Sequence, residues 1–155
     1  MSKFIVQEHH STHLHFDFRL EMEGVLKSWA IPKGPSMNPK DKRLAIMVDD
    51  HTLEYSSYEG IIPDGQYGSG VVVIWDSGEY ELLKGDIQEG RIEFYLKGKK
   101  LNGVFTLIKM SGKQKEWLLI KKKDHFAQPD FVMKTILTPA LRKKLKFKIP
   151  PCAAS

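Results

Sequence analysis

The chain has 155 residues, of which 41% are hydrophobic, and it contains one cysteine, Cys152. This length suits one compact domain that buries an ordinary core without disulfides. No run approaches the ~18 apolar residues of a membrane span, and the polar start of the chain lacks the apolar stretch of a secretory signal. We therefore expect a single cytoplasmic domain over residues 1–155, with no membrane partner and no cysteine chemistry.

The net charge of +5 conceals a division along the chain. Residues 1–96 carry 9 Lys and Arg against 16 Asp and Glu, whereas residues 97–155 carry 15 against 3, so the two parts have charges of −7 and +12. A basic half can bind a polyanion, because neutralised phosphates release counterions. It can equally be a solvated surface, and charge alone does not decide between a nucleic-acid partner and none.

The first clear element is residues 14–21, LHFDFRLE, in which apolar and polar side chains alternate. This alternation is typical of a strand with one buried face. Short runs bounded by turn residues predict further strands at 26–31, 43–48, 71–75, 79–83, 91–96, 103–110 and 116–121. So many short strands predict an all-β fold, either a barrel or a sandwich.

Two other segments are distinct from these strands. The glycine-rich residues 60–70 are predicted to form a loop entering a strand, and they lack the lysine and hydroxyl of a phosphate-binding P-loop. Thr138 is a candidate N-cap, and Pro139 suits the first position of a helix that continues through residues 140–145. This helix lies in a basic C-terminal tail, at about residues 134–155.

Histidines are concentrated near the start of the chain, with four of the six between His9 and His15. On a strand, His15 and Asp17 share one face about 7 Å apart and can converge on one ion. Either His9 or His10 could fold back as the third ligand. Surface or hydrogen-bonded histidines are the ordinary alternative, but it does not account for His, Asp and Arg on one face opposite a fully apolar one.

Basic side chains near these ligands are suited to phosphate. Arg19 follows Asp17 on the same face, and a guanidinium can hold two phosphate oxygens while a metal polarises a third. In the strand at 43–48, Arg43 shares a face with Asp49 and, if the strand stays regular, with His51. A rim salt bridge is the ordinary alternative for any single arginine. The combination favours phosphoryl chemistry.

Three spaced motifs carry a family resemblance. They are QEHHSTHLHFDFRLEMEGVLKSWAIPKGPS, RLAIMVDDHTLEY and YEGIIPDGQYGSGVVVIWDSG. Together they resemble the 3'-phosphoesterase domain of bacterial and archaeal DNA ligase D, densely from residue 4 to about 78 and more loosely to about 123. The resemblance implies a compact β-barrel with short helical segments. It also implies a manganese-dependent enzyme that removes a 3'-terminal ribonucleoside and then the 3'-phosphate, leaving a 3'-hydroxyl end.

The resemblance also implies roles for particular residues. The metal ligands would be His9, His15 and Asp17, for Mn²⁺ or another divalent ion such as Zn²⁺ or Co²⁺. The catalytic and phosphate-binding residues would be Arg19, Lys33, Arg43, His51 and Tyr55, with Gln7 and Asp49 in support. Asp49 departs from the family, which usually has glutamate at this position.

The family also implies the substrates and partners. These are DNA or RNA-tailed DNA 3' ends, with a separate DNA ligase and polymerase, because the sequence resembles a stand-alone form without those domains. We expect Arg19 to hold the phosphate and Arg43 and Lys33 to neutralise charge in the transition state. His51 would transfer a proton, orient the phosphate or attack it, and metal-bound water is the other candidate nucleophile.

Two other functions fit the sequence. His15-x-Asp17 followed by His51 also matches the ligand set of non-haem iron oxygenases. Alternatively, the basic half could bind nucleic acid without catalysis, with any metal purely structural. A site with four protein ligands would favour the binding module, whereas three ligands and open positions would favour an enzyme.

Overall fold

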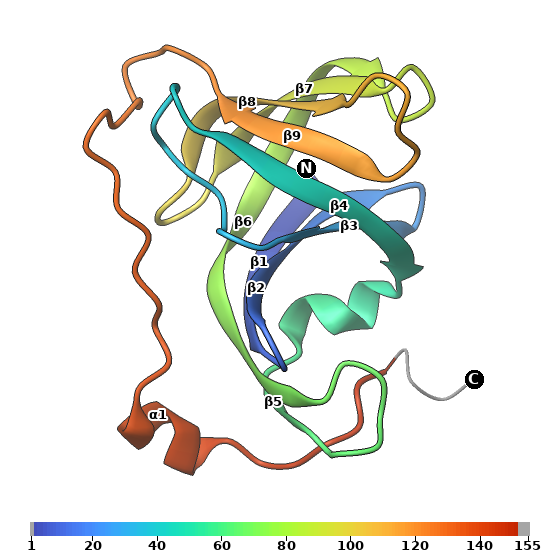
Figure 1. Ribbon diagram of the computed structural model, residues 1–155, viewed down its shortest axis with the longest axis vertical. Helices are drawn as coiled ribbons and strands as arrows, with labels where there is room; N and C mark the ends of the chain where they lie inside the picture. Colours follow the sequence, from blue (N-terminus) through green and yellow to red (C-terminus); the bar gives the residue numbers. More distant parts are fainter. Residues whose placement is uncertain (1, 152–155) are drawn as a thin grey trace.

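A computed structural model describes residues 2–151 of the chain, and Cys152, which we expect to have no chemical role, lies outside them. The described residues form nine strands, a 3-10 helix η1 and a short α-helix α1 (Figure 1). Their bounds are β1 Ser2–His10, β2 Leu14–Met22, β3 Val25–Ile31, β4 Lys42–His51, η1 Leu53–Ser57, β5 Gly60–Ile62, β6 Gly70–Asp86, β7 Arg91–Lys97, β8 Asn102–Lys109, β9 Glu116–Lys121 and α1 Pro139–Lys144.

Eight of the strands form a closed antiparallel barrel. Their order is β1-β2-β3-β4-β9-β8-β7-β6, and β6 pairs again with β1 to close the ring. The short strand β5 pairs with β6 outside this ring. Closure leaves no unpaired edge among these eight strands. The predicted all-β barrel is therefore confirmed.

The long strand β6 replaces two predicted strands, 71–75 and 79–83. It is continuous because it pairs in turn with β5, with β1 and with β7 along its 17 residues. At its start, a Cβ on Gly70 would lie 2.2 Å from the carbonyl oxygen of His10, and the φ of Gly70 is +120°. Glycine is therefore required where β6 meets the end of β1.

The sequence analysis did not predict strand β1. All six residues from Phe4 to His9 are buried. Phe4 and Val6 face the barrel core, whereas Gln7 and His9 face outward beneath other segments. Because both faces are covered, β1 lacks the apolar–polar alternation that marks a half-exposed strand.

The two faces of β2 have different roles. Phe16, Phe18 and Leu20 point into the barrel and join a core that includes Trp29 of β3 and Trp117 of β9. His15, Asp17 and Arg19 alternate with them and therefore lie on the outer face of the barrel wall. The polar cluster is thus built on the outside of the barrel rather than in its lumen.

Helix α1 begins as predicted, since the Thr138 hydroxyl accepts a hydrogen bond from the N–H of Leu141 and Pro139 occupies the first turn. Within residues 2–151, no helix has the length and hydropathy needed to cross a membrane. Figure 1 shows the chain after β9 descending one side of the barrel to α1 and then passing beneath β5. The predicted C-terminal tail is therefore packed along the barrel.

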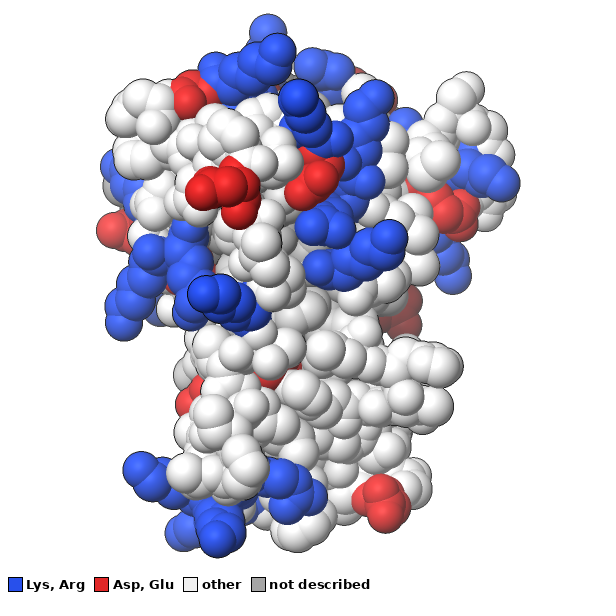
Figure 2. Space-filling model, turned by 60° about the vertical axis from the view of Figure 1, so that its left-hand side comes forward, with Lys and Arg blue, Asp and Glu red and all other residues white. Residues whose placement is uncertain are grey.

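Charged side chains are unevenly distributed over one face of the molecule. Figure 2 shows Lys and Arg gathered at the upper part, together with several acidic residues, and again at the lower end. The band between them carries few charges. Figure 1 places α1 at the lower end, and the last turn of α1 holds Arg142, Lys143 and Lys144.

Candidate metal centre and adjoining cavity

His9, His15 and Asp17 form the one group of potential metal ligands found among the described residues. One ligand atom from each lies within 4.8 Å of the others. Residue His9 of β1 is directly opposite His15 of β2, so strand pairing brings them together on the face that also carries Asp17. The His9 Nδ1 and His15 Nε2 atoms are 3.4 and 3.3 Å from the two oxygens of the Asp17 carboxylate.

Backbone carbonyls fix the orientation of both imidazoles. His9 Nε2 lies 2.7 Å from the carbonyl oxygen of Gly68, and His15 Nδ1 lies 3.0 Å from that of His13. A carbonyl oxygen only accepts hydrogen bonds, so these ring nitrogens carry protons, and each ring directs its other nitrogen toward Asp17. This is the arrangement in which metal-binding histidines are held by their surroundings.

The electrostatics of the cluster fit a bound cation. Burial opposes ionisation of Asp17, but hydrogen bonds from His15 and His9 and the charge of Arg19 hold its pKa well below the usual range. Burial likewise opposes protonation of His15, but the Asp17 carboxylate outweighs it and raises the pKa of His15. Two imidazole nitrogens and a carboxylate thus converge where positive charge is favoured, and this donor set would fit Mn²⁺ or Zn²⁺ once the ion replaces the ring protons that face Asp17.

Next to this cluster lies a fully constrained arginine. Arg19 is 2% exposed, and its Nη2 is 3.4 Å from Asp17. Its Nε donates to Gln7 Oε1 at 2.7 Å, and Nη1 donates to the Ser28 hydroxyl at 2.9 Å. The guanidinium also lies 4.7 Å from the ring centre of Tyr55. Arg19 therefore presents its charge in one orientation.

Gln7 connects Arg19 to the segment that covers it. Its side chain is fully buried, and Nε2 donates to the carbonyls of Tyr55 and Tyr58 at 3.0 and 3.2 Å while Oε1 accepts from Arg19. Each hydrogen-bonding atom of the amide has a partner of the matching type. Gln7 is thus a positioning residue between the barrel wall and η1.

His51 lies on the other side of Arg19 from Asp17. Its Nδ1 is 3.0 Å from the Asp49 carbonyl oxygen and 3.2 Å from Arg19 Nη1. We assign the Nδ1 proton to the bond with the carbonyl, because that oxygen only accepts, which leaves a lone pair on Nε2. Burial, followed by the charge of Arg19, lowers the pKa of His51, so its neutral form is favoured.

These side chains line one open cavity with a volume of about 850 Å³. The metal cluster, Arg19, His51 and Tyr55 form one side. The rim comes from the β1–β2 turn, from residues 66–69 and from Pro150 near the C-terminus. A cavity of this size can hold a nucleotide, and its lining includes the Arg19 cation and the three potential metal ligands.

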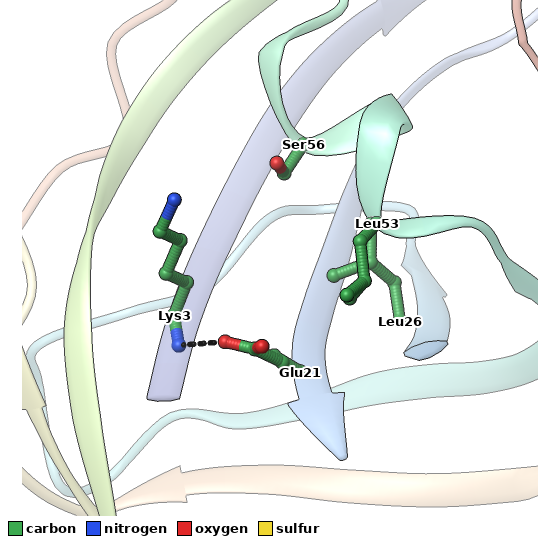
Figure 3. Close-up of a pocket in the computed structure, with 5 residues that line it drawn as sticks. All are labelled: Lys3, Glu21, Leu26, Leu53 and Ser56. Atoms are coloured by element: carbon green, nitrogen blue, oxygen red, sulfur yellow. Dashed lines mark hydrogen bonds between the residues drawn. The ribbon is translucent and has the colours of Figure 1, made fainter. Parts of the chain in front are cut away.

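A second cavity lies at the opposite ends of β1 and β2. It is small, about 80 Å³, and Figure 3 shows its lining of Lys3, Glu21, Leu26, Leu53 and Ser56. The Glu21 carboxylate accepts a hydrogen bond from the backbone N–H of Lys3 at 2.9 Å. This cavity has one basic side chain and no histidine, so it lacks the convergent groups of the larger one.

Comparison with known proteins supports the family resemblance. Residues 7–109 match the model of the DNA Ligase D 3'-phosphoesterase domain. The chain belongs to this family. It is 47% identical over 127 residues to the multifunctional non-homologous end joining protein LigD of Pseudomonas aeruginosa, covering 79% of this chain and 15% of that protein. The LigD proteins of Mycobacterium bovis and Mycolicibacterium smegmatis are 44% and 40% identical over 130 and 156 residues, covering 83% and 94% of this chain.

The chain therefore spans only 15–20% of the length of these LigD relatives. The part that matches the phosphoesterase family model includes the metal cluster, Arg19, His51 and Tyr55. Pro150, which completes the cavity rim, lies beyond the matched residues.

Within this phosphoesterase domain, the predicted placement of Arg43 was wrong. Two residues of β4, Asp49 and Asp50, oppose the single residue Lys27 of β3 between the pairs Ser28–Val48 and Leu26–His51, and this bulge reverses the alternation. His51 therefore lies on the outer face, whereas Arg43 is opposite the core residue Leu119. Arg43 pairs with Asp41 at 3.4 Å and does not line the cavity.

The other residues predicted for the phosphoesterase site differ in whether they line the cavity. Lys33 is exposed and follows Pro32, a lining residue, at the end of β3 as predicted. The side chain of Asp49 is exposed at the cavity, where its backbone carbonyl holds His51. His10 contacts Glu8 and lies outside the cluster, whereas His9 lies within it beside His15 and Asp17.

Two contributors to the phosphoesterase site were missed. Gly68 supplies a carbonyl from the loop that we read as purely structural, and Ser28 holds Arg19. Ser28 had a detectable signal, because it is a small polar residue between Leu26 and Trp29 in a buried strand. A backbone carbonyl leaves no such signal in the side-chain pattern.

Proposed function

We propose that this domain is a metal-dependent phosphoesterase that heals DNA and RNA-tailed DNA 3' ends for DNA repair. It would remove a 3'-terminal ribonucleoside and then the remaining 3'-phosphate, leaving a 3'-hydroxyl for a separate ligase or polymerase. The observation that supports this most is the row Asp17, Arg19 and His51 along one cavity wall, with the ligand cluster at one end. Family membership and the non-homologous end joining relatives agree with it.

His9, His15 and Asp17 would hold the metal ion, with Mn²⁺ as our proposed cofactor. When bound, the ion would supply Lewis-acid polarisation of a phosphate oxygen and positive charge near the leaving group. Three protein ligands on an open cavity wall suit a catalytic site better than a closed structural one.

Arg19 would bind the phosphate beside the metal. Its Nε and Nη1 donate to Gln7 and Ser28 and its Nη2 pairs with Asp17, which leaves further N–H groups on the guanidinium for a phosphate oxygen. Because its orientation is set before substrate arrives, little reorganisation is needed as negative charge develops. Lys33, which is flexible and exposed, would contribute longer-range neutralisation.

His51 would act at the phosphorus. Its Nδ1 is held by the Asp49 carbonyl, so Nε2 is the nitrogen left to accept a proton, orient the phosphate or attack it. Tyr55 packs edge-on against His51 with ring centres 4.8 Å apart and lines the same cavity. It would position His51 and contact the leaving group.

The decisive experiment uses a labelled primer–template that ends in one 3'-ribonucleotide. Metal-stripped protein is incubated with and without Mn²⁺, and products are separated on a denaturing gel. We expect conversion to a 3'-phosphate and then to a 3'-hydroxyl, abolished in His15→Ala and Asp17→Asn. His125→Ala, which changes an exposed histidine outside the cavity, is the matched control.

The rival functions predict other results. Absence of product with several metals, despite measured metal loading, would overturn the proposal and favour a binding module. An oxygenase would consume oxygen with iron. We expect no such consumption, because the buried Arg19 guanidinium beside the cluster suits a phosphate.

A further inference from the structure

The C-terminal segment, residues 134–150, is fixed to the barrel by a buried carboxylate. The Glu8 side chain is fully buried in β1 and accepts hydrogen bonds from the N–H groups of Ile136 and Leu137 at 2.7 and 3.1 Å. The Trp75 indole donates to the carbonyl of Lys134 at 2.8 Å. Hydrogen bonds that a buried carboxylate accepts are charge-assisted, so they hold the backbone more firmly than hydrogen bonds in exposed positions do.

The second half of the segment is anchored as well and ends at the large cavity. Leu141 and Leu145 pack on a cluster that includes Ile61. Ile61 then exchanges backbone hydrogen bonds with Lys146 and Lys148, as in a parallel strand pair. Two residues later, Pro150 is buried and lines the cavity. The segment thus follows a defined path to the rim of the candidate active site.

The outer surface of this path is basic. Six Lys and Arg lie between residues 134 and 150, and no acidic residue follows Asp130 in the sequence. Five of them, Arg142, Lys143, Lys144, Lys146 and Lys148, lie within seven residues of one another and are exposed. Across residues 2–151, no Asp or Glu forms an ion pair with any of these five side chains. Figure 2 shows such a basic cluster at the lower end of the molecule.

Apolar side chains alternate with the last of these lysines. Phe147 and Ile149 are 68% and 59% exposed, although each adjoins a lysine and the segment is anchored on both sides. A solvated charged face gives no reason to expose an aromatic ring on a fixed backbone. Cationic side chains interleaved with an exposed aromatic are the arrangement that binds nucleic-acid strands, through phosphates and stacked bases.

We propose that residues 142–149, which we call the basic rail, bind the nucleic-acid strand that leads to the 3' end in the cavity. Arg142, Lys143, Lys144 and Lys146 would contact phosphates, and Phe147 would stack on a base. This inference rests on the proposed function. It adds the surface that would bind the part of the strand that lies before the reacting 3' end.

The spacing along the chain sets how much of the strand is needed to reach the rail. Pro150 lies four positions after Lys146, so the two residues are at most ~14 Å apart. This corresponds to about four phosphates along one strand of B-form DNA at 3.4 Å each. About four nucleotides before the 3' end are therefore enough to reach from the cavity rim to Lys146, and contact with the rest of the rail needs a longer strand.

The test compares two triple variants that remove the same charge. Lys143→Ala/Lys144→Ala/Lys146→Ala alters the rail, and Lys97→Ala/Lys99→Ala/Lys113→Ala alters exposed lysines at the end of β7 and on the β7–β8 and β8–β9 turns. Binding of a fluorescent 20-nucleotide primer–template with a 3'-hydroxyl is measured by anisotropy at several salt concentrations. We expect the rail variant to bind at least about tenfold more weakly, with a salt slope lower by about one per lost phosphate contact.

Turnover supplies a second readout. The loss of kcat/KM in the rail variant, relative to the unsubstituted protein, should be larger for a 12-nucleotide upstream strand than for a 3-nucleotide one. Phe147→Ala should weaken binding while leaving the salt slope unchanged. Equal losses of affinity in both triple variants, or no change of affinity in the rail variant, would overturn the proposal that the rail binds the strand.

These outcomes separate the rail from the proposed function. Binding to the 3'-hydroxyl duplex requires no chemistry, so a rail-dependent affinity without end processing would retain the rail and reject the phosphoesterase. End processing with unaltered affinity in the rail variant would retain the phosphoesterase and reject the rail. Circular dichroism and thermal unfolding of both triple variants exclude loss of folding as the cause.

Discussion

His9 Nε2 lies 2.7 Å from the carbonyl oxygen of Gly68, and this contact turns the other ring nitrogen of His9 toward Asp17. It joins the end of β1 to the glycine-rich loop 60–70, so the loop orients a ligand as well as forming the cavity rim. Gly68 has a φ of +75°, a left-handed conformation that suits glycine.

The first prediction concerns which histidine binds metal. His9→Ala should lower the affinity for Mn²⁺ by more than about 100-fold, because even the loss of a residue that orients a ligand costs about 10–100-fold. His10→Ala should retain the affinity, since its ring contacts Glu8 and is not part of the cluster. Isothermal titration calorimetry on stripped protein measures both. Equal losses in the two variants would contradict this assignment.

The second prediction concerns Gln7 as the support of Arg19. Gln7→Met keeps the volume but leaves Arg19 Nε and the carbonyl of Tyr58 without their side-chain partner, whereas the Tyr55 carbonyl still accepts from the N–H of Tyr58. We expect the free energy of unfolding to fall by about 3 kcal/mol, since each unsatisfied buried group costs about 1–3 kcal/mol. Urea denaturation measures this, with Gln114→Met on an exposed turn as the control. A positioning role further predicts that Gln7→Met raises KM.

The third prediction is the titration of His51. Burial and the nearby Arg19 charge both disfavour the imidazolium, so the pKa lies below the ordinary value of 6.5. His51 should therefore keep its Nε2 lone pair at neutral pH and lose it only at more acidic pH than a free histidine. Arg19→Gln removes the repelling charge and should raise the pKa. NMR titration of the His51 ring nitrogens tests this, and a midpoint above 6.5 in the unsubstituted protein would refute it.

The fourth prediction concerns the anchoring by Glu8. Glu8→Ala removes the acceptor of the Ile136 and Leu137 N–H groups. Hydrogen exchange at these amides should accelerate by about tenfold or more, because their protection depends on this carboxylate. Mass spectrometry of peptides covering residues 131–145 measures the change. Glu79→Ala, at an exposed position of β6, should leave the exchange unaltered. Unchanged exchange in Glu8→Ala would show that other contacts hold the segment.

Much of the barrel was predictable because its strands have one covered and one more open face. The alternation in β2 identified both the core residues Phe16 and Phe18 and the polar row of His15, Asp17 and Arg19. The N-cap of α1 was predictable from local chemistry alone. Where local pattern and tertiary environment agree, the sequence is sufficient.

The failures have specific physical causes. Strand β1 is covered on both faces, so it shows no alternation. The bulge in β4 places Arg43 and His51 on opposite faces of the strand. Counting residues along the sequence cannot reveal the extra residue that forms a bulge. The C-terminal segment appeared to be a tail, because its anchors are backbone groups that bond to Glu8, 128 residues away from Ile136. The proximity of His15 and Asp17 was predicted by their spacing, whereas the placement of His9 rather than His10 beside them was implied by the family pattern.

The two ends of the described chain lie at different cavities, and one of them is at the large cavity. Lys3 lines the small cavity at the other end of β1, whereas Pro150 lines the large one. Attachments to the protein are therefore not equivalent in a binding or turnover assay. A fluorophore, purification tag or surface tether placed ahead of Ser2 leaves the cavity mouth open, but the same group placed directly after Pro151 would compete with the substrate for space.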